Sequence, residues 1–323
     1  HLPSGSVDLL ESEGDPRAVL PAFMAEHPDH PYSKVGLASI EASLADLQRH
    51  CALQGLPLFR QERNHQRLTP IGTLKSTWLS PETCACVTEA PAPDVLLLAT
   101  LEGFRDFHPA LAAANLATHS RFAHSRILTG EIRLPQLAAF SRNPHEFRSA
   151  DIARLFDKQQ HDKQDLLTDL AREIGRMVQE CGEPGCRHIV LPACLSLGLV
   201  GPRLAELEAR TGCTIKEVAT MPPSLIGMRM QEALKRRVLT LGGTFLTSER
   251  VLGARYEGDR VVGVHSQNGD DQLFEADHFV LASGSFFSRG LESRLRGIRE
   301  PIFDADVLSL PERYAWAGRR LFD

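Results

Sequence analysis

The chain has 323 residues, of which 42% are hydrophobic and 24% charged, a composition typical of a globular protein. Its formal net charge of −5 gives no general attraction to nucleic acid or anionic lipid. No apolar run is long enough to span a bilayer, and the length allows two domains or one large elaborated domain.

The first predicted element is a helix over residues 33–54, whose apolar residues share one face and which Gly55 ends. From residue 94 onward, strand and helix patterns alternate. Buried strands are predicted at 94–101, 125–135, 187–195 and 213–220. Helices are predicted between them at 109–122, 144–158, 163–181 and 203–210. This alternation predicts βαβ crossovers and a mainly parallel sheet.

The cysteines are seven in number and scattered, which is typical of reduced thiols rather than of a disulfide framework. Cys181, Cys186, His188 and Cys194 lie close enough in sequence to raise a metal site. However, the C-x-x-C pairs of zinc ribbons are missing, and residues 189–191 have the pattern of a strand core. We therefore predict free thiols and no metal.

The pattern changes at the turn 221–224, which enters a helix that Gly242-Gly243 closes. Short strands follow, with turn residues at 258–259 and 268–270 that predict a meander. A buried strand over 279–282 then ends in small residues. This order is typical of the later half of a flavin-binding doubly wound domain, where strand ends lie at the dinucleotide crevice. An ordinary strand-to-turn glycine is the alternative, and the chain contains no G-x-G-x-x-G fingerprint.

Seven stretches match a known family: SGSVDLL (4–10), HPYS (30–33), HQRLTPIGTLKSTWLS (65–80), NPHEFRSADIARLFD (143–157), MPPSLIGMRMQ (221–231), VLASGSFFSRGL (280–291) and GIREPIFDADVL (297–308). With them the chain resembles the B subunits of the anaerobic glycerol-3-phosphate dehydrogenase. These are flavoproteins related to the fumarate reductase and succinate dehydrogenase flavoprotein class. Compared with a complete member, the amino-terminal G-x-G-x-x-G unit and a carboxyl-terminal glycine-rich segment are missing, so we expect a fragment lacking both termini.

The resemblance implies a flavin subunit with non-covalent FMN, FAD being the alternative. It implies two partners, a catalytic flavin subunit and an iron–sulfur membrane-anchoring subunit, and a cytoplasmic location at the inner membrane. Together the subunits oxidise sn-glycerol 3-phosphate to dihydroxyacetone phosphate and pass electrons to quinone in anaerobic respiration. A small-molecule electron donor is expected, and no nucleic acid. Two rival functions stay open: an independent flavin oxidoreductase acting on a small hydroxy acid or polyol phosphate, and a non-catalytic assembly subunit.

The predicted fold class is α/β, a doubly wound flavin-binding (Rossmann-like) domain with a large inserted α/β domain. Residues 1–32 and 221–285 form the incomplete flavin-binding domain in this prediction. The inserted domain covers 56–220, and the tail 286–323 returns towards it.

The predicted flavin contacts come from three segments and the turn before the 225–241 helix. In the 69–78 segment, Thr73 and Lys75 could hold a phosphate or a flavin carbonyl, with a solvated loop as the alternative. The 4–6 stretch is a small-residue loop for the pyrophosphate or ring, with a simple terminal loop as the alternative. The 283–285 stretch lets the flavin approach, and Phe286 is either an apolar wall or a core residue. The full set of predicted cofactor contacts is Ser4, Gly5, Ser6, Thr73, Lys75, Ser224, Ser283, Gly284, Ser285 and Phe286.

Two arginines are candidates for binding a substrate or anion, and no catalytic residue is assigned. Arg229 follows the Pro-Pro turn, and a surface charge or ion pair is the alternative to a ligand contact. Arg299 could clamp a carboxylate or phosphate, or pair with the neighbouring Glu300. His65 and His108 are weighed as acid–base groups, although neither has an adjacent carboxylate motif.

Overall fold

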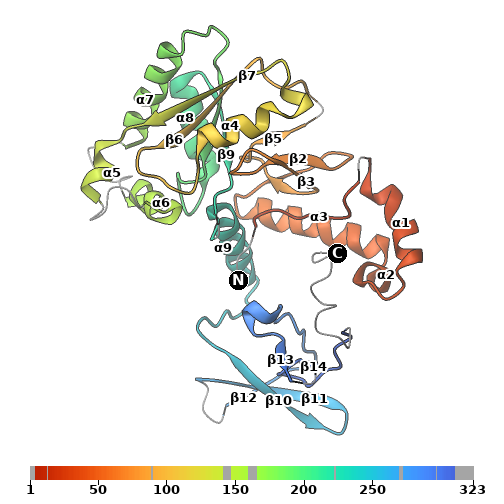
Figure 1. The fold of residues 1–323 in the computed structure, drawn as a ribbon. Coiled ribbons are helices and arrows are strands. Elements are labelled where there is room, and N and C mark those ends of the chain that lie inside the picture. The colour runs from red at the N-terminus through yellow and green to blue at the C-terminus, as the bar shows by residue number, and fades with distance from the viewer. Residues whose placement is uncertain are drawn as a thin grey trace. The chain divides into compact units, whose positions relative to one another are not determined.

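The computed structural model describes residues 4–12, 14–88, 90–140, 147–158, 166–221, 223–268, 272–295 and 297–309. The chain divides into two compact units. The larger comprises Leu2–Gly243, and the smaller comprises Thr244–Asp323 together with His1. Figure 1 shows the elements of both.

A four-stranded parallel sheet is the centre of the larger unit. Its order is β7-β6-β8-β9, formed by β7 (Arg126–Ile132), β6 (Val95–Leu101), β8 (His188–Pro192) and β9 (Thr214–Val218). All seven residues of β6 are buried, as expected for a central strand with both faces covered. The four strands predicted between residues 94 and 220 are thereby confirmed.

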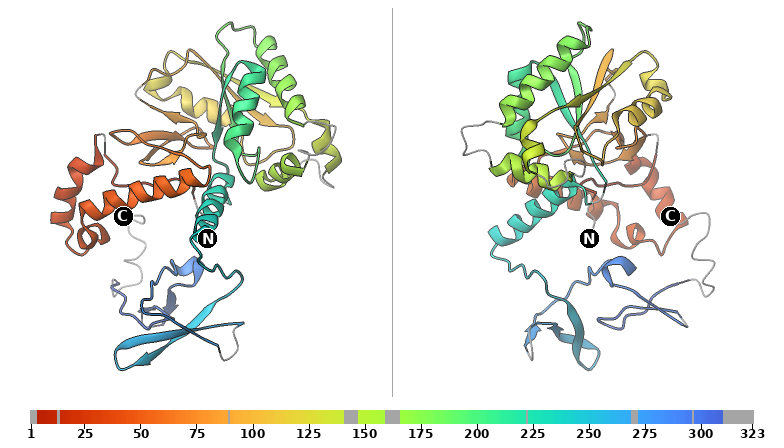
Figure 2. Two further views of the ribbon diagram at one scale, coloured as in Figure 1. Left: turned by 180° about the vertical axis from the view of Figure 1, so that it is seen from behind. Right: turned by 60° about the vertical axis from the view of Figure 1, so that its left-hand side comes forward.

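Helices cover both faces of this sheet. The connections contain α4 (Pro109–Ala117), η1 (Ser120–Phe122), α5 (Pro135–Phe140), α6 (Ser149–Lys158), α7 (Leu166–Glu180) and α8 (Val200–Thr211). Figure 2 shows α7 and α8 on one face and α4 on the other. Right-handed crossovers require this, because the chain steps from β6 to β7 in one direction and from β8 to β9 in the opposite direction.

A helical and antiparallel part completes the larger unit. Its helices are α1 (Pro16–Glu26), α2 (Pro31–Val35) and α3 (Leu37–Leu53), so the helix predicted over 33–54 is interrupted at Gly36. Its strands are β2 (His65–Leu68), β3 (Leu74–Thr77) and β5 (Cys86–Val87) in the order β3-β2-β5, and the pair β1 (Leu58–Phe59) and β4 (Ser80–Pro81). The segment between β4 and β5 joins this part to the parallel sheet, since Cys84 bridges Glu217 of β9.

The predicted helix after the 221–224 turn is confirmed as α9 (Leu225–Thr240). It packs against α3 around the buried Trp78, with Met230 and Ala233 on the contact face. The first turn of α9 packs against buried side chains that follow the parallel strands, among them Ala193 and Ala219. The start of α9 therefore lies at the carboxyl edge of the parallel sheet.

The smaller unit contains the predicted meander of β10 (Val251–Glu257), β11 (Arg260–Ser266) and β12 (Leu273–Glu275), followed by the hairpin of β13 (Glu292–Arg294) and β14 (Gly297–Arg299). The strand predicted over 279–282 is wrong. These residues pair with no strand in the described part of the chain, and Val280 is 90% exposed. An apolar run becomes a buried strand only when a neighbouring strand satisfies its backbone hydrogen bonds.

The mixed α/β class with a parallel sheet is confirmed. The boundary between the units follows α9 and falls inside the predicted piece 221–285. The assignment of a flavin-binding domain and an inserted domain stays a prediction. Among the described helices, none combines the length and the apolar character that crossing a bilayer requires.

Candidate functional site

The 4–6 loop lies directly against the first turn of α9. Gly5 is buried with φ +73°, and a Cβ placed there would lie 2.5 Å from Ile226 Cγ2 and 2.7 Å from the Gly227 nitrogen. Only glycine allows both the backbone angle and this approach. The next residue but one, Val7, forms a bridge with Leu79. The fold thus brings the predicted 4–6 stretch to the helix that follows the predicted Ser224.

Ser224 is the N-cap residue of α9, but its hydroxyl makes no capping hydrogen bond. Its side chain is buried, and Oγ has no hydrogen-bond partner in the described structure. The first N–H groups of a helix have no intrahelical acceptor, and the helix dipole makes this end positive. Unused donors therefore gather at the start of α9.

Arg67 lies on β2 beside the same loop and was not among the predicted site residues. It is 7% exposed, and one terminal nitrogen donates to the Ser4 carbonyl at 3.2 Å. Its Nε is buried without a partner, and it forms no ion pair with a carboxylate of the described residues. The two-residue period of a strand, which puts His65 and Arg67 on one face and Gln66 on the other, is the sequence signal that could have found it.

Arg229 is held in a buried ion pair. Two of its nitrogens donate to the Glu217 carboxylate at 2.6 and 3.0 Å, and Nε donates to the Ser196 carbonyl at 2.7 Å. Both side chains are almost completely buried. The ion-pair alternative therefore describes Arg229 in this structure, and its anion-binding role stays a prediction.

His65 is almost fully buried and hydrogen-bonds through Nε2 to the Ser80 hydroxyl at 2.7 Å. Burial lowers the pKa of His65 to about 4, with the neighbouring Arg67 contributing. The imidazole is therefore neutral at pH 7, and its Nδ1 has no partner among the described residues. Burial also raises the pKa of Cys84 and Cys86 above the usual thiol range. The other weighed histidine, His108, is exposed at the start of α4.

Thr73 lies in the turn between β2 and β3, and Lys75 lies on β3 opposite Arg67 of β2. Thr73 shares a hydrogen bond of 2.7 Å with Thr69 across an exposed turn. Lys75 forms an ion pair of 2.5 Å with Asp8, which ties it to the amino-terminal stretch. The fold therefore connects Lys75 to the residues that follow the 4–6 loop, whereas Thr73 lies in the turn beyond β2.

The predicted 283–286 contacts lie in the smaller unit. Ser283 lines a pocket of about 460 Å³ together with residues 279–282 and Ser288. The Ser288 hydroxyl donates to the Ser283 carbonyl at 2.6 Å, and Gly284, with φ +79°, makes the turn between them. Phe286 is 45% exposed, so it is not a core residue. The flavin contact of this stretch stays a prediction.

Arg299 also lies in the smaller unit. Its Nε donates to Asp304 at 2.6 Å, and the pairing with Glu300 considered from the sequence does not occur. Glu300 is buried and instead accepts hydrogen bonds from the backbone nitrogens of Ile302 and Phe303, both at 2.7 Å. Its carboxylate thus stabilises the turn after β14.

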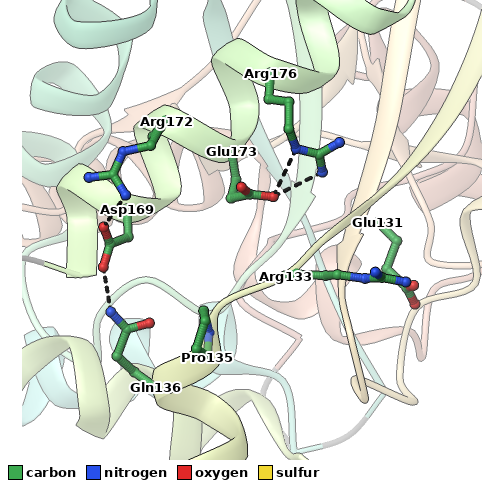
Figure 3. Close-up of a pocket in the computed structure, with 8 residues that line it drawn as sticks. All are labelled: Glu131, Arg133, Pro135, Gln136, Asp169, Arg172, Glu173 and Arg176. Carbon is green, nitrogen blue, oxygen red and sulfur yellow. Dashed lines mark hydrogen bonds and ion pairs between the residues drawn. The ribbon is translucent and has the colours of Figure 1, made fainter.

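A separate pocket of about 700 Å³ lies between α5, α7 and the end of β7 (Figure 3). Three arginines and three carboxylates line it, and two of the arginines pair with two of the carboxylates. Arg172 bonds Asp169 at 2.8 Å, and Arg176 bonds Glu173 at 2.9 Å. The equal numbers of positive and negative side chains give the pocket no net charge to select an ion. Across the described residues, no group of three or more potential ligands is placed to hold a metal.

We define the loop–helix junction as the 4–6 loop, Arg67 and the first turn of α9, which the structure brings together. Its glycine lets the loop pack directly against the helix, and its unpartnered donors suit a phosphate or a ring carbonyl. Four predicted contacts, at positions 4, 5, 6 and 224, meet there. The missed member is Arg67.

Comparisons with known proteins identify the family of the chain. A model of the FAD binding domain family matches residues 4–323. The B subunit of the anaerobic glycerol-3-phosphate dehydrogenase of Vibrio vulnificus is 37% identical over 331 residues, which cover 100% of this chain and 73% of that protein. The B subunits of the same enzyme from Yersinia enterocolitica and Haemophilus influenzae are 36% and 35% identical, with 75% of each covered.

No solved structure is significantly similar to the chain. The family model is that of an FAD-binding domain, so it supports a flavin and gives no support to the predicted FMN. Both comparisons identify a flavoprotein oxidoreductase. The chain belongs to the FAD binding domain family and, within it, to the family of anaerobic glycerol-3-phosphate dehydrogenase B subunits.

Proposed function

We propose that the protein is the flavin subunit of an anaerobic respiratory glycerol-3-phosphate dehydrogenase. In this proposal it supports the oxidation of sn-glycerol 3-phosphate to dihydroxyacetone phosphate and passes the electrons towards quinone. The similarity to B subunits over the whole chain is the observation that carries this proposal. The relatives are named as subunits, which supports a complex. As partners we propose a catalytic flavin subunit and an iron–sulfur subunit that anchors the complex at the inner membrane.

We further propose that the cofactor is FAD, because the matching family model describes an FAD-binding domain. A bound flavin supplies two-electron acceptance from a donor and one-electron transfer to an iron–sulfur partner. The residues of the loop–helix junction hold it in this proposal. Gly5 lets the 4–6 loop pack against the first turn of α9, while Ser224 and the first N–H groups of α9 donate hydrogen bonds.

The buried residues beside the junction support an electron-transfer role more than direct substrate oxidation. Removing a hydroxyl proton during hydride transfer requires a base in contact with the substrate. His65 lies beside the junction, but it is 1% exposed and bonded to Ser80. This geometry favours a subunit that receives electrons from a partner's flavin.

The test is to purify the intact protein alone and with its partner subunits, and to identify the released cofactor by mass. We expect FAD, and FMN would restore the prediction made from the sequence. In stopped-flow experiments, sn-glycerol 3-phosphate should reduce the flavin of this subunit only when the catalytic subunit is present. Reduction of the isolated subunit would instead identify an independent oxidoreductase, and an intact protein without flavin would indicate an assembly subunit.

A further inference from the structure

Buried polar atoms without partners lie on both sides of the 4–6 loop. Eight buried side-chain nitrogen and oxygen atoms of the described residues have no hydrogen-bond partner. Five of them lie between Asn64 and Thr83, and a sixth is the Ser224 hydroxyl. Buried polar groups are normally paired, so the unpartnered Arg67 Nε and Ser224 Oγ, which lie on either side of this loop, indicate a missing ligand.

The charges at the same place do not balance. Arg67 is opposite Cys86 in the β2–β5 ladder, and Glu217 is opposite Cys84 in the bridge to β9. The short 84–86 segment therefore brings Arg67 close to the Arg229–Glu217 pair. Glu217 is fully used by Arg229, which leaves Arg67 as a buried cation without a carboxylate among the described residues. A buried charge is stable only when it is paired.

A second set of donors lies across the 4–6 loop from Arg67. Arg67 bonds the carbonyl of Ser4, and the next residue, Gly5, touches the backbone of Ile226 and Gly227. The start of α9, a helix of 16 residues, therefore lies one loop away from the guanidinium. The Ser224 side chain there is 6% exposed and unpartnered among the described residues, so two independent buried groups accompany the helix end.

We propose that the loop–helix junction binds a phosphate group, held by the Arg67 guanidinium, the Ser224 hydroxyl and the first N–H groups of α9. A guanidinium and a helix N-terminus are both suited to phosphate oxygens. The choice of phosphate over another oxyanion rests on the proposed function, in which both ligands, a flavin nucleotide and glycerol 3-phosphate, carry this group. The phosphate comes from one of these two sources.

Inorganic phosphate tests the shared chemistry on the intact protein. Phosphate should raise the melting temperature of the wild type, and R67M should remove this shift while R67K keeps part of it. S224A should reduce the shift less than R67M does. The matched control is Q66M, since Gln66 is the exposed neighbour on the same strand, and its shift should equal that of the wild type.

Titration of the flavin-free protein identifies the source. If the flavin phosphate binds here, R67M should weaken the binding of FAD about tenfold to a hundredfold and leave riboflavin binding unchanged. If the substrate phosphate binds here, R67M should keep its flavin and raise the KM for sn-glycerol 3-phosphate in the complex. Either result supports the site.

Wild-type behaviour of R67M and S224A in all three measurements would overturn the inference. Failure of the proposed function is seen separately, as a wild-type protein that holds no flavin and a complex that oxidises no glycerol 3-phosphate. In that case the phosphate-dependent melting shift still decides whether the anion site exists. If R67M does not fold, S224A carries the same three measurements.

Discussion

Two buried arginines of the larger unit differ in how their positive charge is compensated. Arg229 has a carboxylate and a carbonyl for its donors, so its charge is compensated inside the protein. Arg67 is also buried, but among the described residues it has a single backbone acceptor and an unpartnered Nε. The first arrangement is complete without a ligand, whereas the second is completed by an anion. The difference separates a residue that supports the fold from one that is available for binding.

The largest expected effect comes from breaking the compensated arginine. R229M leaves the Glu217 carboxylate buried without its partner, and loss of one member of a buried ion pair costs roughly 3–5 kcal/mol. We expect urea denaturation to show this loss in the free energy of unfolding. The double variant R229M/E217M should be more stable than R229M, because the carboxylate that R229M leaves unpaired is also removed. Equal stability of the single and double variants would contradict the compensated pair.

His65 sharpens the comparison because it is buried without a charge. Its folded pKa of about 4 lies below the unfolded value of about 6.5, so the unfolded chain takes up a proton first as the pH falls. The contribution of neutral His65 to the free energy of unfolding is fully present above pH 6.5. It declines towards pH 4, by up to about 3 kcal/mol. Urea denaturation at several pH values measures this slope. H65Q should flatten it, and an unchanged slope in H65Q would assign it to other groups.

G5A should push the 4–6 loop away from α9. This loop also contains the Ser4 carbonyl that Arg67 contacts. The positive φ and the close approach to Ile226 together should lower the free energy of unfolding by roughly 1–3 kcal/mol. The control is G175A on α7, where a new Cβ meets nothing within 4 Å. That control should raise stability by about 0.5–1 kcal/mol. Unaltered stability in G5A would show that the loop does not need its contact with the helix.

The smallest effect is expected for R67M in phosphate-free buffer. Removing an uncompensated buried cation leaves no opposite charge unpaired, so the free energy of unfolding should stay unchanged or rise by about 1 kcal/mol. Urea denaturation of R67M beside R229M measures the contrast directly. A loss in R67M as large as that in R229M would show that Arg67 has an internal partner and would remove the distinction between the two.

Much of the fold could be predicted, since the apolar runs at 94–101 and 187–195 become central strands. The residues 279–282 are also a run of consecutive apolar residues, yet they form no strand in the described structure. A strand depends on a neighbour as well as on its own residues, and the identity of the neighbour is not written in a local pattern.

Part of the candidate site could likewise be predicted from the sequence, and part could not. The sequence by itself determined that small residues occupy positions 4–6 and that a helix begins after Ser224, because these are local properties of the chain. Only the tertiary structure decided that Arg229 has a carboxylate and that Arg67 has none among the described residues. Glu217 and Arg67 are far apart in sequence. Which arginine pairs with the Glu217 carboxylate therefore depends on which strands lie side by side.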